Sequence, residues 1–134
     1  MNREVRKVSQ SIHALNHARI DAAMKVHTAL GPGLLESAYE HCLCYELTRQ
    51  GVHAAHQVAL PIWYDGHKID AGYRIDMLVE NKIIIELKAV DKLLPVHEAQ
   101  LLSYLRLANK RLGFLLNFNV KSFRDGIKRM VNNF

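Results

Sequence analysis

The alternation of apolar and polar side chains is most regular between Tyr73 and Val90. A period of two is typical of β-strands, because successive side chains of a strand point to opposite faces. We therefore predict two strands here, joined by a short loop at residues 80–82, with the apolar odd-numbered face lying under helices. The apolar odd-numbered positions are Ile75, Met77, Val79, Ile83, Ile85, Leu87 and Ala89.

The length of this loop decides which side chains face each other across the two strands. A three-residue loop pairs Val79 with Ile83 and therefore Asp76 with Glu86. A two-residue loop would put the apolar residues of the two strands on opposite faces, and such a slip is costly where one face is buried. We expect Asp76, Glu86 and Lys88 to converge on one face, where two opposed carboxylates can share one cation.

The alternative for these charges is an ordinary solvated strand face. The run from Ile83 to Val90 is nearly continuous in apolar residues, as in a central strand. A charged side chain inside such a strand is costly to desolvate unless it is paired or bound to a metal. The pattern therefore favours a functional site over a solvated face.

The remaining elements complete an α/β architecture. The predicted helices cover about 13–30, 34–49 and 95–109, and the predicted strands fall within 52–69, 73–90 and 112–118. Asp65-Gly66 is a strong hairpin signal, and Pro95 suits the first turn of a helix. The stretch after Asn119 fits either a short helix or an edge strand, and the polar residues 1–12 are expected to fray. This order predicts helices covering a mixed sheet.

Composition and charge narrow the functional classes only slightly. The 134 residues suit one domain spanning 1–134, and the net charge of +5 is compatible with a polyanionic partner. No apolar stretch approaches the roughly 20 residues that a membrane span needs. The N-terminus lacks an apolar signal core, so we expect a cytoplasmic protein without membrane contact.

Cysteine and histidine do not predict a transition-metal centre. Cys42 and Cys44 lie about 200° apart around a predicted helix, so they cannot chelate one metal together and are expected to be reduced core thiols. His13 and His17 have the spacing of a zinc pair, but no third ligand suggests itself. Solvated or core histidines are therefore favoured.

Two helices carry polar residues on a common face. His97, Gln100 and Tyr104 are spaced by three and four, which fits either a site or an amphipathic helix with a few polar residues. Glu36 and Tyr39 share a face of the second helix, where a first-turn Glu is also favoured by the helix dipole. Leu35, Ala38 and Cys42 form the more apolar side, which we expect to pack on the sheet, leaving Glu36 at the edge near Asp76 and Glu86.

The chain resembles the GxxExxY family of the PD-(D/E)XK nuclease superfamily. The name-giving motif reads Gly33-Leu-Leu-Glu36-Ser-Ala-Tyr39, and the likeness extends through Tyr73-Arg-Ile-Asp76, Ile85-Glu86-Leu-Lys88-Ala-Val, Val96-His-Glu-Ala-Gln100-Leu-Leu-Ser-Tyr104 and Gly113-Phe-Leu-Leu-Asn117-Phe. Ile75 stands where the motif's name has proline. The resemblance implies a restriction-endonuclease-like core with a mixed central sheet and the order α-β-β-β-α-β.

The resemblance also implies roles for individual residues. Asp76, Glu86 and Lys88 match the superfamily motif, and Gln100 with Tyr104 resembles the Gln-x3-Tyr feature of RecB-type nucleases. Glu36 matches the acidic residue that related nucleases place on an early helix.

These roles lead to an expected chemistry, metal-dependent hydrolysis of phosphodiesters. Asp76 and Glu86 would hold Mg²⁺ or Mn²⁺, with the Leu87 carbonyl as a third protein ligand, because hard cations prefer oxygen. Lys88 would orient water or stabilise the transition state, and Glu36 would bind a second metal or position its water. Substrate contacts are assigned to Gln100, Tyr104, Tyr39 and Arg74, with further phosphate contacts from Lys92, Arg106, Lys110 and Arg111.

DNA is the expected substrate, and three alternatives stay open. RNA is the first alternative. A dimeric junction resolvase, which a chain this short would suit, is the second. The third is a catalytically silent binding module that retains the nuclease fold.

Overall fold

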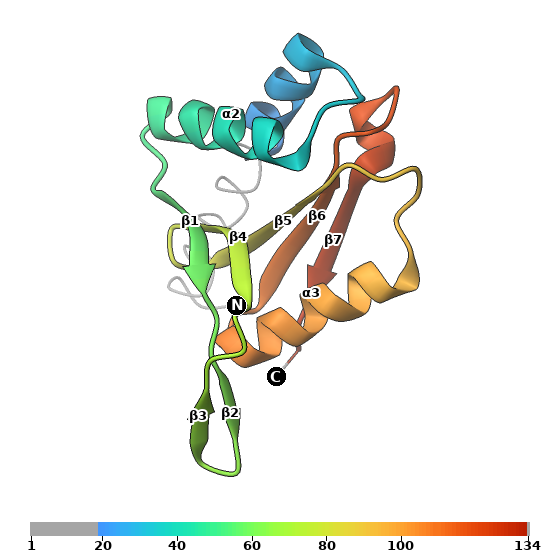
Figure 1. The fold of residues 1–134 in the computed structure, drawn as a ribbon. Helices are drawn as coiled ribbons and strands as arrows, with labels where there is room; N and C mark the ends of the chain where they lie inside the picture. The colour runs from blue at the N-terminus through green and yellow to red at the C-terminus, as the bar shows by residue number, and fades with distance from the viewer. Residues whose placement is uncertain (1–18, 134) are drawn as a thin grey trace, which may run out of the picture.

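The computed structural model describes residues 19–133, which form helices packed on both faces of a central sheet (Figure 1). A first helix occupies 19–30 and is followed by α2 (Glu36–Arg49), β1 (Ala54–Ala59), β2 (Ile62–Tyr64), β3 (His67–Ile69), β4 (Arg74–Val79), β5 (Ile83–Lys88), α3 (Pro95–Ala108), β6 (Leu112–Asn117), a 3₁₀ turn (Phe123–Gly126) and β7 (Ile127–Val131). The expectations for residues 1–12, His13 and His17 lie outside the described residues.

Over residues 19–133 the strands form a five-stranded sheet in the order β1-β4-β5-β6-β7 and a separate β2–β3 pair. Only β5 and β6 run parallel to each other in the larger sheet, so it is mixed. Setting aside the β2–β3 hairpin, the order from α2 to β6 is α-β-β-β-α-β. The predicted α/β class, with a mixed sheet flanked by helices, is confirmed. The ambiguous C-terminal stretch forms both a short 3₁₀ turn and an edge strand.

The β4–β5 register is the predicted one. Val79 pairs with Ile83 and Met77 with Ile85, so three residues form the loop. Glu80 and Asn81 adopt φ values of 53° and 54°, and the Lys82 N–H donates to the Val79 carbonyl at 3.0 Å. This tight turn keeps the apolar residues of both strands on a common face.

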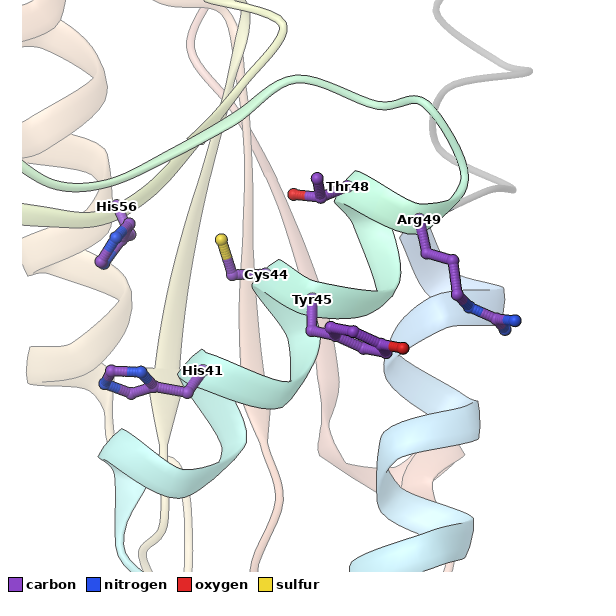
Figure 2. Close-up of a pocket in the computed structure, with 6 residues that line it drawn as sticks. All are labelled: His41, Cys44, Tyr45, Thr48, Arg49 and His56. Atoms are coloured by element: carbon purple, nitrogen blue, oxygen red, sulfur yellow. The ribbon is translucent and has the colours of Figure 1, made fainter.

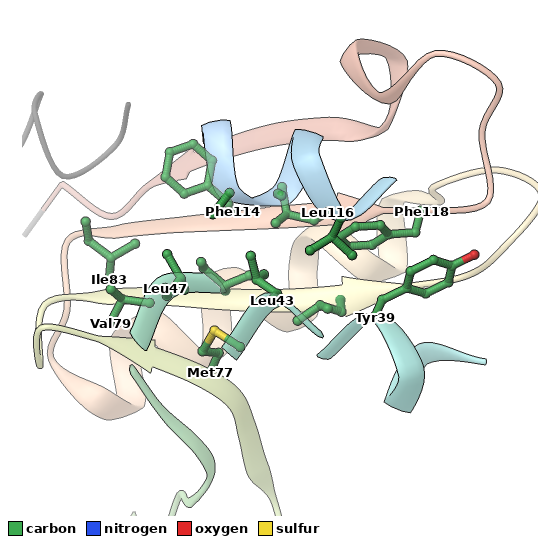
Figure 3. Close-up of a cluster of buried hydrophobic side chains, with 14 of the residues drawn as sticks. Tyr39, Leu43, Leu47, Met77, Val79, Ile83, Phe114, Leu116 and Phe118 are labelled. Atoms are coloured by element: carbon green, nitrogen blue, oxygen red, sulfur yellow. The ribbon is translucent and has the colours of Figure 1, made fainter. Parts of the chain in front are cut away.

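Two hydrophobic clusters flank the sheet, one on each face. Figure 3 shows the larger one, in which α2 side chains pack over odd-numbered residues of β4 and β5 and over β6. Its labelled members are Tyr39, Leu43, Leu47, Met77, Val79, Ile83, Phe114, Leu116 and Phe118. The other face packs against α3 through Ile84, Leu101 and Leu105. Burial of the odd-numbered face under helices is therefore confirmed for most of its length.

Ile75 departs from the predicted parity. It belongs to the α3-side cluster with Leu60, whereas Met77, two residues later, packs on the α2 side. On the neighbouring strand Gln57 has a φ of 53°, in the left-handed region that L-residues seldom adopt. The β1–β4 ribbon therefore changes faces around Gln57 and Asp76.

The docking face of α2 also differs from the prediction. The helix packs on the sheet through Tyr39, Leu43 and Leu47, whereas Leu35 is 77% exposed. The predicted face through Leu35, Ala38 and Cys42 was thus wrong. Large side chains at the other positions bury more apolar surface against the sheet, and burial dominates the choice of face.

The cysteines agree with the expectation of reduced thiols. Cys42 and Cys44 are half-buried and free. Within residues 19–133, no helix combines the length and the apolar character needed to cross a membrane.

Candidate active site

Asp76 of β4 and Glu86 of β5 interlock through backbone hydrogen bonds. The Asp76 N–H donates to Glu86 Oε1 at 3.2 Å, and the Leu87 N–H donates to Asp76 Oδ2 at 2.9 Å. The antiparallel register, continued past Met77 and Ile85, puts the two acidic residues opposite each other. Two carboxyl groups are therefore held side by side at the point where the β1–β4 ribbon changes faces.

Burial makes this pair electrostatically unusual. Glu86 is only 4% exposed, and burial together with the nearby Asp76 charge raises the pKa of its carboxyl to about 9, while Lys88 opposes that rise. A buried carboxyl beside a second carboxylate is stable either with a proton or with a cation. The donor set therefore suits a small hard cation.

Lys88, Gln100 and Tyr104 form a hydrogen-bonded chain beside the pair. Lys88 Nζ donates to Gln100 Oε1 at 3.3 Å, and Gln100 Nε2 donates to the Tyr104 hydroxyl at 3.3 Å. Burial and the charge of Glu86 raise the pKa of Tyr104, so its hydroxyl lies within the field of the carboxyl pair. These three residues come from β5 and α3, which pack together on the even-numbered face.

His97 has a different task from its neighbours on α3. Its Nδ1 accepts the Leu94 N–H at 2.9 Å at the start of the helix. Of the three residues predicted to share a face of α3, His97 therefore caps the helix, and Gln100 and Tyr104 lie beside Lys88.

The structure does not join the two motif residues of α2 to this group. Glu36 is exposed in the first turn, and in the described part of the chain it makes no hydrogen bond or ion pair with Asp76, Glu86 or Lys88. Tyr39 is fully buried; its hydroxyl donates to the Gly31 carbonyl at 2.6 Å and accepts the Leu34 N–H at 3.0 Å.

Tyr39 therefore differs from the substrate contact expected of it. Its ring stacks on Phe118 with centroids 4.5 Å apart, and its hydroxyl ties down the Gly31–Leu34 turn. The last proposed substrate residue, Arg74, is exposed at the start of β4, and its guanidinium donates to the Tyr73 carbonyl at 2.9 Å.

The sequence analysis missed Glu40 and Gln57. Glu40 of α2 is 8% exposed, and its Oε1 accepts the Gln57 amide at 2.8 Å. The β1–β4 register puts Gln57 opposite Asp76, so a buried carboxylate of α2 is linked to the strand position facing the site. The sequence pattern could have indicated Glu40, because it lies on the same helical face as Leu43 and Leu47, and a charged residue is unusual on a buried apolar face.

Asn117 supports the end of β5 on the other side. It is 2% exposed and lies beside Lys88 in the parallel β5–β6 register. Its side chain accepts the Val90 N–H at 3.1 Å and donates to the Val90 carbonyl at 2.9 Å. These two hydrogen bonds fix the backbone just after Lys88, where the chain leaves β5.

Residues 19–133 contain no group of three or more His, Cys, Asp or Glu side chains arranged to hold a metal ion. A cation at Asp76 and Glu86 would therefore need other oxygens, such as the Leu87 carbonyl, to complete its coordination. A cavity of about 390 Å³ lies elsewhere, between α2 and β1, lined by His41, Cys44, Tyr45, Thr48, Arg49 and His56 (Figure 2). It includes none of the proposed site residues.

Comparison with known proteins adds a family to this geometry. The family model described as PD-(D/E)XK nuclease superfamily matches residues 13–130. Searches of curated proteins and of solved structures returned no significant match. The matched range spans α2, the sheet and α3, including Asp76, Glu86 and Lys88. The chain belongs to the PD-(D/E)XK nuclease superfamily.

Proposed function

We propose that this protein is a single-domain member of the GxxExxY family. In this proposal it is a metal-dependent nuclease that hydrolyses phosphodiester bonds in DNA. The observation that carries the proposal is the interlocked pair of Asp76 and Glu86 beside Lys88. A fold retained only for binding has no need of a buried carboxyl whose pKa is raised to about 9. Membership of a nuclease superfamily supports the same conclusion.

The two carboxyl groups fit Mg²⁺ or Mn²⁺. Asp76 and Glu86 would hold the ion, with the Leu87 carbonyl as a further ligand, since both metals prefer oxygen donors. When bound, the ion acidifies water and offsets negative charge on the phosphate. Displacement of the Glu86 proton by the cation would relieve the electrostatic cost of ionising this carboxyl.

Lys88 supplies the positive charge of the proposed site. Gln100 holds the ammonium group through its side-chain oxygen, so the charge is already oriented before substrate arrives. A preoriented cation stabilises charge that develops on a phosphate in the transition state. The Tyr104 hydroxyl accepts the Gln100 amide, so its own proton can be donated to a phosphate oxygen.

Cleavage of defined substrates tests the proposal. The full chain is incubated with linear, circular and branched DNA and with RNA, in Mg²⁺, in Mn²⁺ and in EDTA. We expect metal-dependent cleavage of DNA that is lost in Lys88→Met. Lys25→Met is the matched control. Lys25 lies on the first helix and forms an ion pair with Glu46 of α2, outside the site.

The outcome also separates the alternatives. Cleavage confined to RNA or to branched DNA would replace the substrate class and keep the chemistry. Cleavage that persists in EDTA or in Lys88→Met would contradict the proposed site. Binding without cleavage in every condition would favour the silent module.

A further inference from the structure

The β2–β3 hairpin projects from the body of the protein as a sheet of its own (Figure 1). Its two strands, Ile62–Tyr64 and His67–Ile69, pair antiparallel around Asp65 and Gly66, whose φ values are 51° and 75°. Positive φ at both central residues is the geometry of the tight type I′ turn. Apart from half-buried Ile62, every residue of the two strands is exposed.

The exposed side chains combine two aromatic rings with the charge of Lys68. Trp63 is 62% exposed and pairs with Lys68, while Tyr64 is 72% exposed and pairs with His67. Successive residues of a strand alternate in direction, so one face of the hairpin carries Trp63 beside Lys68 and the other carries Tyr64 beside the His67 imidazole. The acidic residues of the hairpin lie outside its strands, Asp65 in the turn and Asp70 directly after β3.

The base of the hairpin is continuous with the proposed active site. At this base the Leu60 N–H donates to the Tyr73 carbonyl at 3.0 Å. The Tyr73 ring meets Tyr104 edge-on with centroids 6.0 Å apart, and exposed Arg74 follows, two residues before Asp76. An extended ligand that lies along the hairpin would therefore continue toward Asp76 and Glu86.

We infer that the β2–β3 hairpin binds unpaired bases of a single-stranded nucleic-acid segment next to the cleavage site. Exposed aromatic rings bind single strands because each base offers a flat face for stacking. In a duplex those faces are covered by neighbouring base pairs, so the rings have no such partner. Lys68 and Arg74 complement the phosphates of the same strand, in keeping with the net charge of +5. The inference rests on the proposed function for the direction in which that strand continues.

Trp63 is the only tryptophan of the chain, which makes binding directly visible. The metal-free full chain in EDTA is titrated with a 12-nucleotide oligothymidine and with a blunt 12-base-pair duplex. We expect the single strand to quench the Trp63 fluorescence and to bind more tightly than the duplex. In anisotropy measurements with labelled oligothymidine, Trp63→Ala should weaken binding roughly 5- to 150-fold, the range of one stacked base.

Tyr45→Ala is the matched control, because Tyr45 is 65% exposed on α2, outside the hairpin. It should bind oligothymidine like the wild type, and circular dichroism should show both variants folded. Equal affinity of wild type and Trp63→Ala, or tighter binding of the duplex, would overturn the inference. So would sedimentation showing that Trp63→Ala converts a dimer to a monomer, because the partner would then be a second copy.

These outcomes are separable from the proposed nuclease activity. Binding is measured in EDTA, so it does not depend on cleavage. Metal-dependent cleavage without Trp63-dependent binding removes the hairpin inference alone. Trp63-dependent binding without cleavage under any metal condition supports the hairpin and contradicts the nuclease proposal.

Discussion

Replacing Glu86 with glutamine should stabilise the metal-free protein at neutral pH. Gln keeps the oxygen that accepts the Asp76 N–H at 3.2 Å, and it cannot ionise. The carboxyl of Glu86 has a pKa near 9 in the folded chain against an ordinary value of 4.5, owing first to burial and then to Asp76. The substitution therefore isolates the cost of keeping this carboxyl protonated in the folded chain at a pH at which it ionises in the unfolded chain.

The sign of the pH dependence follows from proton binding. Above pH 4.5 the unfolded chain releases a proton that the folded chain keeps, so the free energy of unfolding falls as pH rises toward about 9. Each unit of pKa difference corresponds to about 1.4 kcal/mol, which gives a penalty of about 3 kcal/mol at pH 7. Glu86→Gln lacks this penalty, so its advantage should be absent near pH 4.5 and grow with pH.

Urea unfolding in EDTA at pH 5, 7 and 8.5 measures the effect. Glu98→Gln is the matched control, because Glu98 is a partly exposed α3 residue paired with Lys128, and such pairs contribute at most about 1 kcal/mol. Adding Mn²⁺ should stabilise the wild type through binding to the folded state, and Glu86→Gln much less. A Glu86→Gln variant that is less stable than the wild type at pH 8.5, or a difference that does not change with pH, would refute the reasoning.

Three further substitutions test individual residues. Lys88→Met should abolish cleavage and leave the melting temperature unchanged or higher, because it removes a half-buried charge at similar volume; an unfolded variant would mark Lys88 as structural. Tyr39→Phe should lower the free energy of unfolding by about 1–3 kcal/mol in urea, since it leaves the Gly31 carbonyl and the Leu34 N–H without their partner, while oligonucleotide affinity stays unchanged; weakened affinity would restore Tyr39 to substrate binding. Glu36→Gln should cost no more than about 1 kcal/mol, the value of a charge at a helix N-terminus, because Glu36 is exposed; a loss of cleavage by orders of magnitude at unchanged melting temperature would instead show that Glu36 acts in the site.

The local pattern of the sequence determined the β4–β5 hairpin and with it the carboxyl pair. The period of two and the three-residue loop specify which residues face each other, and the observed pairing of Val79 with Ile83 follows from them. The same holds for α3, where spacings of three and four bring Gln100 and Tyr104 together. These relations depend only on the residue spacing within one hairpin or one helix, so they can be predicted without knowledge of the rest of the fold.

Tertiary structure decided how these elements are oriented against one another. The stripe of α2 that docks on the sheet buries Tyr39 and Glu40 and leaves Leu35 exposed, because docking is chosen by the total apolar area removed from water across several elements. The change of faces of the β1–β4 ribbon, marked by the left-handed Gln57 on β1, puts Ile75 in the α3-side cluster. Neither outcome is a property of a short stretch of sequence. Only the packed sheet brings buried Glu40 of α2 against Gln57, at the strand position opposite Asp76.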